Sequence, residues 1–432
     1  MEPLWSRTAV ELAEQIRTGQ TTAVAVVEAC LERIRSLEPV INAWEYLDPE
    51  AALAQARQCD QSAPAGPLHG VPVAVKDIFD TFDMPTAYGS SIYAGHRPQT
   101  DAESVARLRA AGAVILGKTV TTEFATFCPG KTSNPHNPAH TPGGSSSGSA
   151  AAVAARMVPL AYGSQTVGSV VRPASFNGVT GLKADYGRFS LNGVKPLAPA
   201  LDTLGFFARR VDDIALILNA LEGKTAASPE PKGLPNPKVA VIRTAHWETA
   251  DLASKRALEA TMDRLSNAGA VVSEPDLPPD FADLADVQNT FFTAGAAHSL
   301  KTEWQDHRDE LSPQLQTVIL EGLQQNKADL AAAEEVAARC RRHMDTLFGG
   351  TDFIIAPAAV GEAPEGLEKT GDPLFSRMWT VLHGPCISLP GFKGDTGLPV
   401  GVQLIGKRGG DETLLRWARW VENLLPEPDW PD

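Results

Sequence analysis

Apolar residues recur along the chain with two different periods, which predict both helices and buried strands. In residues 21–37 apolar side chains return every three or four positions, as on one face of a helix, and residues 8–19 follow a similar pattern. Residues 70–76 (GVPVAVK) are apolar almost throughout, which is typical of a strand covered on both faces of a sheet. Lys76 stands at the end of this strand, so the burial of its charged side chain needs a reason.

Helix and strand patterns alternate along the rest of the chain. Residues 101–111 predict a helix that stops at Gly112, and residues 113–116 predict a short buried strand. Residues 128–144 contain four prolines, which predicts a long loop, and residues 283–347 are mostly helical in pattern. Further helices are expected over 149–157, 250–267 and 411–425, and further strands over 239–242, 270–272, 353–356, 387–389 and 400–405. This order predicts an α/β fold.

The composition is that of a soluble globular protein. Hydrophobic residues make up 43% and charged residues 21% of the 432 positions. The formal charge of −14 disfavours binding to nucleic acids or anionic membranes and favours small neutral substrates. The five cysteines are scattered, which indicates neither a disulfide framework nor a zinc site. With no signal-peptide pattern and no apolar run of about 18 residues, we expect a cytoplasmic protein without metal or cofactor.

Three short segments carry residue types that nucleophilic catalysis requires. They are the strand end at Lys76, the run of residues 143–149 (GGSSSGS) and the run of residues 163–169 (GSQTVGS). A serine hydroxyl is a poor nucleophile until a neighbouring group accepts its proton, and a neutral lysine can be that group. A Gly/Ser run can also be a flexible linker. The place of residues 143–149, between a long loop and an alanine-rich helix, favours catalysis over a linker.

Other motifs suggest different functions. Residues 112–119 (GAVILGKT) match the phosphate-binding loop GxxxxGK[ST], but the strand lies between the glycines instead of before them, so nucleotide binding is the less favoured alternative. Residues 144–148 match the GxSxG elbow of α/β-hydrolases, yet no strand is predicted directly before them. His136 and His140 are four positions apart, but the prolines around them exclude the helix that would direct both at one metal ion.

Several longer motifs spread over the chain agree with one family. They are residues 66–77 (GPLHGVPVAVKD), 122–125 (TEFA), 134–138 (NPHNP), 141–146 (TPGGSS), 168–174 (GSVVRPA), 181–188 (GLKADYGR) and 398–406 (LPVGVQLIG). Together they resemble the amidase signature family, from about residue 8 to about residue 425. The resemblance implies one α/β domain over residues 1–432, with a mixed, mostly parallel twisted sheet of about eleven strands and helices on both faces. Within it we expect N-terminal helices over 1–60, the catalytic core over 61–220 and a variable helical region of the substrate pocket over 283–347.

The resemblance also implies a catalytic triad without histidine. Ser169 would be the nucleophile, Ser145 a bridging serine preceded by a cis peptide bond, and Lys76 the base. Protons would pass from Ser169 to Ser145 to Lys76, which must be neutral, as burial promotes. Asp77 would oppose this by its charge, but successive strand residues point to opposite faces.

The remaining site residues follow from the same resemblance. The backbone amides of Thr166, Val167, Gly168 and Ser169 would form an oxyanion hole. The residues expected to bind substrate are Thr126, Phe127, Cys128, Ser146 and Gln165, together with residues 283–347, where Phe291 and Phe292 lie.

The nucleophile segment departs from the family pattern. Most members have Asp-Thr-Gly-Gly-Ser-Ile-Arg where this chain has QTVGSVV. Gln165 therefore stands where the family has aspartate, Val171 stands where it has arginine, and the arginine of this chain follows one position later at Arg172. We hypothesise that a neutral arrangement around Gln165 replaces a charge pair. An Arg172 that meets a carboxylate in the usual place would contradict this hypothesis.

The function expected is that of an amidohydrolase that cleaves a carboxamide, anilide or carbamate through an acyl-enzyme on Ser169. The substrate is expected to be neutral and apolar or aromatic, and the protein a monomer or homodimer. The alternative within the family is the subunit that supplies ammonia for transfer-RNA-dependent amidation, which works only with partner chains. The acidic charge and the relatively short chain favour a free-standing hydrolase.

Overall fold

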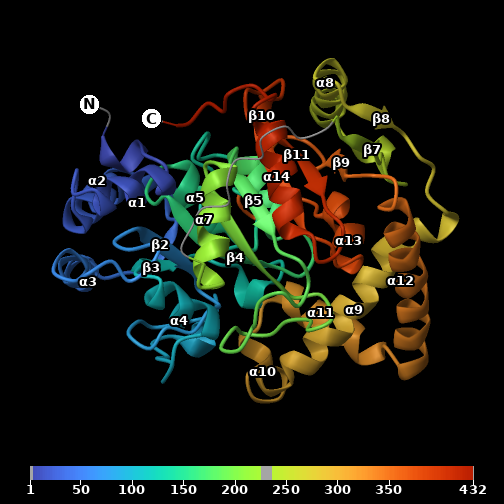
Figure 1. Cartoon of the computed structure of the whole chain (residues 1–432). Coiled ribbons are helices and arrows are strands. Elements are labelled where there is room, and N and C mark those ends of the chain that lie inside the picture. Colours follow the sequence, from blue (N-terminus) through green and yellow to red (C-terminus); the bar gives the residue numbers. More distant parts are fainter. Residues whose placement is uncertain (1–2, 225–235, 432) are drawn as a thin grey trace.

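One mixed β-sheet runs through the molecule and positions the segments described above. The computed structural model describes residues 3–224 and 236–431. In these residues eleven strands pair in the order β1-β3-β2-β4-β6-β5-β10-β11-β9-β7-β8 (Figure 1). The strands are β1 Trp44–Leu47, β2 Pro72–Lys76, β3 Val114–Thr119, β4 Leu160–Gln165, β5 Thr180–Lys183, β6 Thr203–Ala208, β7 Lys238–Val241, β8 Val271–Ser273, β9 Phe353–Pro357, β10 Cys386–Lys393 and β11 Pro399–Ile405.

The sheet is mixed, as expected, but it is not mostly parallel. Strands β3, β2 and β4 pair in parallel, and so do β9, β7 and β8. Every pairing from β4 through β6, β5, β10 and β11 to β9 is antiparallel, as is that of β1 with β3. The expectation of a mostly parallel sheet was therefore wrong. The short connection from β10 to β11 shows one reason, since only antiparallel neighbours can be joined by a tight turn.

Helices cover both faces of this sheet. The helices of the described residues are α1 Ala9–Arg17, α2 Ala23–Ile41, α3 Pro49–Asp60, α4 Glu103–Ala110, α5 Ser147–Ala154, α6 Val171–Asn177, α7 Val211–Leu221, α8 Leu252–Asn267, α9 Leu284–Ser299, α10 Lys301–Asp306, α11 Pro313–Gln324, α12 Lys327–Leu347, α13 Leu374–Val381 and α14 Asp411–Glu422. Ala74 and Ala161 pack with α2, α3 and α5, whereas Val73 and Leu160 pack with α1, α4 and α7. The chain is thus a single α/β domain. No helix in the described ranges is both long and apolar enough to span a bilayer.

Helix ends follow local sequence signals. Thr8 accepts a hydrogen bond from the amide of Glu11, whose side chain accepts one from the amide of Thr8, so α1 begins with a capping box. Asp48 caps α3 directly before Pro49, a residue suited to the first helical position. The N-terminal helices were therefore predictable from short stretches of sequence.

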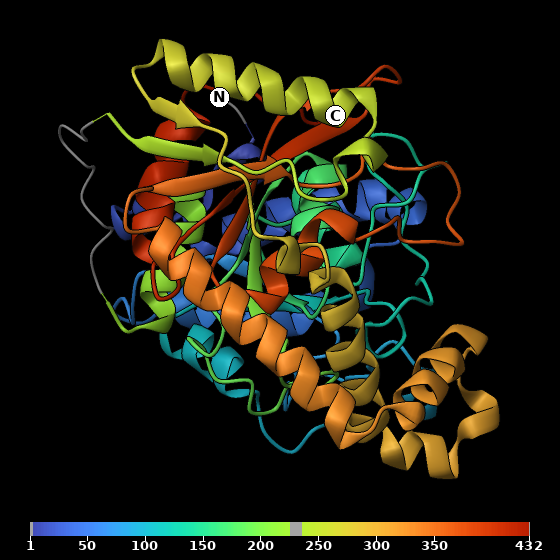
Figure 2. The ribbon, with the colours of Figure 1, turned by 90° about the vertical axis from the view of Figure 1, so that its right-hand side faces the viewer.

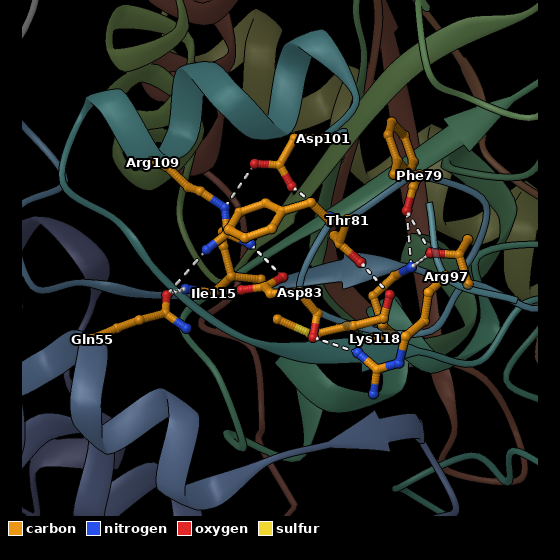
Figure 3. Close-up of polar contacts among 12 residues, drawn as sticks. Gln55, Phe79, Thr81, Asp83, Arg97, Asp101, Arg109, Ile115 and Lys118 are labelled. Carbon is orange, nitrogen blue, oxygen red and sulfur yellow. Dashed lines mark hydrogen bonds and ion pairs between the residues drawn. The ribbon is translucent and has the colours of Figure 1, made fainter. Parts of the chain in front are cut away.

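The phosphate-loop motif at residues 112–119 is part of the sheet. Residues Val114–Thr119 form β3, which pairs with β1 on one side and β2 on the other. Lys118 is fully buried, and its Nζ lies 2.9 Å from the carbonyl oxygen of Phe79 (Figure 3). The same nitrogen lies 3.0 Å from Asp77 Oδ1 and 2.6 Å from Thr86 Oγ1. Neither the backbone amides nor the lysine can reach a phosphate. The nucleotide-binding alternative was therefore wrong.

The helices of residues 284–347 gather at one end of the molecule. Helices α9 to α12 lie on the opposite side from α1 to α3 (Figure 1), and α10 and α11 project from the body of the domain (Figure 2). They are tied to the core by polar contacts: Lys195 pairs with Glu303, and Glu123 accepts hydrogen bonds from the amide and hydroxyl of Ser312. This helical region therefore borders the loop that follows Thr122.

Glu422 at the end of α14 offers a stability measurement. Its Oε1 accepts a hydrogen bond from the amide of Val211 in the first turn of α7, at 3.0 Å. Burial raises the pKa of Glu422 from 4.5 to about 7. Because the folded state holds the proton more tightly than the unfolded state, this group stabilises the fold below pH 4.5, and the contribution is lost as the pH rises through 7.

Glu422→Gln should remove this pH dependence while it keeps an oxygen that can accept from Val211. Between pH 4.5 and 8 we expect the unfolding free energy of the native protein to fall, relative to the variant, by on the order of 2 kcal/mol. Urea unfolding of both proteins across this range measures the difference. A constant difference at every pH would contradict the raised pKa.

Candidate active site

Lys76, Ser145 and Ser169 are placed at one edge of the sheet. β2 and β4 are parallel neighbours, with Val73 opposite Leu160. Lys76 is the last residue of β2, and the loop that carries Ser169 connects β4 to α6, while Ser145 lies just before α5. Since the carboxyl ends of parallel strands meet at the same edge, the three segments converge there, where α/β proteins commonly bind ligands.

Lys76 is fully buried and surrounded by hydroxyl groups. Its Nζ lies 2.7 Å from Ser145 Oγ and 2.9 Å from Ser164 Oγ. No carboxylate in the described residues forms an ion pair with it. Burial lowers the pKa of Lys76 well below its ordinary value, whereas the charge of Asp202 acts in the opposite direction. The geometry therefore favours a neutral amine, which can accept a proton from Ser145.

Asp77 points away from this site, as strand geometry predicted. It is buried, and its Oδ1 lies 3.0 Å from Lys118 Nζ, while its Oδ2 accepts a hydrogen bond from the amide of Ala87. Because Asp77 is paired with Lys118, its carboxylate does not stabilise the protonated form of Lys76.

The two candidate serines differ in their surroundings. The peptide bond between Gly144 and Ser145 is cis, and the carbonyl oxygen of Ser145 accepts a hydrogen bond from the amide of Thr122. Ser169 is 6% exposed, and its hydroxyl makes no hydrogen bond to the described residues. Ser145 is thus engaged with the lysine, whereas the hydroxyl of Ser169 is not engaged by the protein.

The loop before Ser169 is held from one side by a carboxylate. Thr166 Oγ1 donates to Asp202 Oδ1 at 2.6 Å, and Asp202 Oδ2 accepts from the amides of Leu197 and Ala198 at 2.9 and 3.0 Å. Burial raises the pKa of Asp202, and these three hydrogen bonds and the charge of Lys76 act against that rise. The loop whose amides were expected to bind an oxyanion is therefore fixed next to the candidate base.

Comparison with known proteins places this arrangement in a family. The family model described as Amidase matches residues 25–415. The chain belongs to the Amidase family. Among curated members, a Glutamyl-tRNA(Gln) amidotransferase subunit from Chloroflexus aurantiacus (strain ATCC 29366 / DSM 635 / J-10-fl) is 33% identical over 457 residues, which cover 93% of each chain. The resemblance inferred from the motifs is thereby confirmed, and the protein is an Amidase-family enzyme that acts on carbon–nitrogen bonds.

Solved structures of Amidase-family enzymes have the same fold. The crystal structure of an amidase superimposes with a TM-score of 0.89 at 30% identity, covering 97% of this chain and 100% of the other. A 6-aminohexanoate cyclic dimer hydrolase complexed with substrate gives a TM-score of 0.86 at 26% identity, covering 98% of both chains. The shared fold therefore extends over at least 97% of this Amidase-family chain.

The environment of Gln165 departs from a charge pair in the way the sequence suggested. Gln165 Oε1 accepts from the amides of Val170 and Val171 at 2.9 and 3.1 Å, and its Nε2 donates to Thr380 Oγ1 at 3.0 Å. Arg172 donates to the carbonyl oxygen of Gly144 at 2.6 Å and to a threonine hydroxyl, and it forms no ion pair with a carboxylate of the described chain. An Arg172 paired with a carboxylate would have contradicted the hypothesis of a neutral arrangement, and the partners of Arg172 are instead a carbonyl oxygen and a hydroxyl.

The side chains expected to bind substrate fall into two groups. Gln165 and Ser146 are fully buried, and Ser146 Oγ donates to the carbonyl oxygen of Ser164 at 3.3 Å, so neither side chain presents a surface to a substrate, contrary to expectation. Thr126 is 5% exposed and its hydroxyl donates to the carbonyl oxygen of Glu123. Phe127 and Cys128 are only half-buried.

Aromatic residues bring the loop after Thr122 together with α9. The rings of Phe127 and Phe292 meet edge to face with centroids 5.5 Å apart. This contact joins two segments that were expected to border the pocket from separate parts of the sequence. Phe127 and Phe292 remain candidates for an apolar wall of the substrate pocket.

The described residues place neither a histidine base next to the candidate serines nor a group of metal ligands. Burial lowers the pKa of His383 to about 3, and its ring stacks on Tyr186 and contacts the carbonyl oxygen of Ala200. Among the residues described, no histidine contacts Ser145, Ser146 or Ser169, and no group of three or more His, Cys, Asp or Glu side chains could hold a metal ion.

Sequence reasoning missed three polar residues at the site. Ser164 contacts Lys76, Asp202 holds Thr166, and Thr380 binds Gln165. Ser164 lies inside the quoted run of residues 163–169, and the alternation of strand residues could have pointed to it. Asp202 and Thr380 are distant in sequence, and no local pattern distinguishes them.

Proposed function

We propose that this chain cleaves a carboxamide through an acyl-enzyme on Ser169, with Ser145 and Lys76 as the proton relay. The observation that supports this most is the fully buried Lys76, which has two hydroxyl neighbours and no carboxylate partner among the described residues. A lysine held neutral in this way can serve as a general base near neutral pH.

The proposed reaction proceeds in two balanced halves. Ser169 Oγ attacks the amide carbonyl carbon while its proton moves to Ser145 Oγ and the proton of Ser145 moves to Lys76 Nζ. The carbonyl oxygen becomes an oxyanion that the amides of the loop from Thr166 to Ser169 stabilise. The C–N bond then breaks, and the leaving nitrogen takes the proton back through the same relay. Water attacks the ester and releases the acid along the reverse path.

The curated relatives support a particular form of this function. They include Glutamyl-tRNA(Gln) amidotransferase subunits that are 32–35% identical and match 93–97% of this chain. This favours the alternative of an ammonia-releasing subunit over a free-standing hydrolase, and it favours partner chains over a monomer or homodimer. Cleavage of a primary carboxamide with release of ammonia is common to both forms, so we propose it as the reaction. All five cysteines are free thiols, which supports the proposed cytoplasmic location.

A substrate panel tests the proposal and separates the two forms. The purified chain is incubated with glutamine, simple primary amides, an anilide and a carbamate, and ammonia and acid release are measured. Turnover of a simple amide by the chain alone supports a hydrolase. Glutamine cleavage that appears only when the chain is co-expressed with the partner chains of an amidotransferase supports the amidotransferase form. If no substrate acylates Ser169 under either condition, as judged by intact-protein mass, the proposed function is wrong.

A further inference from the structure

The loop between β4 and α6 presents its backbone carbonyls to neighbouring helices. Thr380, in the last turn of α13, lies with its Oγ1 2.8 Å from the carbonyl oxygen of Val167. The hydroxyl oxygen of Thr380 also accepts a hydrogen bond from Gln165 Nε2. Thr380 is only 1% exposed, so water does not compete for these contacts.

Gln165 holds the other end of the same loop. Its Oε1 binds the amides of Val170 and Val171, directly after Ser169. One side chain thus joins both ends of the loop, and its remaining amide group is committed to Thr380. The loop conformation therefore depends on the pair formed by Gln165 and Thr380.

In a planar trans peptide unit, the direction of the C=O bond fixes the direction of the N–H bond. In the planar unit between Val167 and Gly168 the C=O and N–H bonds point to opposite sides. Among the peptide bonds of the described chain, only that between Gly144 and Ser145 is cis, so this unit is trans. When Thr380 holds the carbonyl of Val167 on one side, the N–H of Gly168 must point to the other.

Two further observations show that α13 and α9 enclose this loop. A Cβ atom at Gly168 would lie 2.9 Å from Pro373 Cβ and 3.0 Å from Ser376 Cβ, so α13 packs directly on the peptide. Gln288 of α9 is 1% exposed and donates a long hydrogen bond of 3.5 Å to the carbonyl oxygen of Thr166. The peptide unit between Thr166 and Val167 is therefore also held by a side chain from another element, Gln288 of α9.

We propose that Thr380 is a positioning residue that directs the N–H of Gly168 at the oxyanion. This inference rests on the proposed function, because it assigns the amide a role in acyl transfer to Ser169. Thr380 touches no reacting atom and acts through the peptide it holds. Its hydroxyl also lies 3.2 Å from the carbonyl oxygen of Ser376, one turn earlier in α13, so a purely structural role is the competing explanation.

Thr380→Val removes the hydroxyl and keeps the shape, and Thr380→Ser is the matched control that keeps the hydroxyl. Removing an oxyanion donor from another hydrolase lowered kcat by about 10²- to 10³-fold. Loss of orientation without loss of the donor should lower kcat by roughly 10- to 100-fold. We expect KM to change by less than about threefold and Thr380→Ser to retain most of the activity, because ground-state binding does not use the amide.

A boronate or aldehyde that carries the acyl part of the best substrate gives the decisive readout. Such a probe forms a tetrahedral adduct with Ser169, so its affinity should fall in Thr380→Val by about the same factor as kcat, while the affinity of an uncleaved amide analogue stays unchanged. Equal losses for both probes, or an unchanged kcat, would overturn the inference.

Two controls keep this outcome interpretable. Thermal unfolding establishes that each variant is folded, and if Thr380→Val does not fold, Thr380→Cys repeats the test with a weak donor of similar size. If wild-type protein and Ser169→Ala are equally active, the proposed function fails whatever Thr380 does. If Ser169 is required but Thr380→Val behaves like wild type, only the inference about Thr380 fails.

Discussion

Ser169→Ala should lower amide turnover by about 10⁴-fold or more, and any rate that remains would come from substrate binding and oxyanion stabilisation. The change removes one oxygen atom, and with it the site of acylation, from a side chain that is 6% exposed. Ammonia release and the mass of the covalent intermediate, measured on the best substrate of the panel, give the loss.

A control for Ser169→Ala lies in the other serine run. Ser147 is 4% exposed, and its hydroxyl donates to the carbonyl oxygen of Val120. Ser147→Ala removes a comparable buried hydroxyl without touching the relay, so its turnover should stay within a few-fold of wild type. Full turnover by Ser169→Ala, with an acyl adduct still present, would show that another residue is the nucleophile.

Lys76→Met should lower kcat by roughly 10³-fold and remove the acid limb of the pH profile. Burial holds the pKa of Lys76 well below its ordinary value. The active form is the neutral amine, so in the native enzyme kcat/KM falls as the pH drops through this pKa and Lys76 gains a proton. Methionine has no proton to gain, and the small residual rate of the variant should not show this dependence.

A second buried lysine provides the comparison. Lys183 is also fully buried, but its Nζ donates to the carbonyl oxygen of Ala184 and has no contact with the serines. Lys183→Met should keep the acid limb at the pH where wild type shows it. If Lys76→Met retained that limb, a different group would be the base, and Asp202, the carboxylate whose charge acts on Lys76, would be the next to test.

Local sequence was sufficient for several features of the site. The unbroken apolar run before Lys76 predicted a buried strand, and β2 is one. Alternation along that strand separated Asp77 from Lys76, since side chains two positions apart share a face and adjacent ones do not. The strand between the two glycines of residues 112–119 ruled against a phosphate loop for the same kind of reason. Each of these conclusions depends on neighbours in the chain.

Other features escaped the sequence because distant segments create them. The elements β4, β5, β6 and α13 were not predicted, although β4 leads into the loop around Ser169 and Thr380 of α13 holds that loop. The sequences of β4 (LAYGSQ) and β5 (TGLK) are short and contain glycine, so they have no strong period, and pairing between strands supplies the stability that propensity does not. The antiparallel centre of the sheet was missed for the same reason, since local sequence does not contain strand order.

The sequence by itself determined that this chain is an α/β protein of the Amidase family with Lys76, Ser145 and Ser169 as its candidate triad. Motif residues adjacent in the chain carry that information. Only the tertiary structure decided which side chains surround the triad. Gln165 is turned inward to amides and a hydroxyl, Asp202 holds Thr166, and Thr380 holds Val167. Hydrogen bonds act over about 3 Å in space regardless of separation in sequence, so only the folded chain could reveal these contacts.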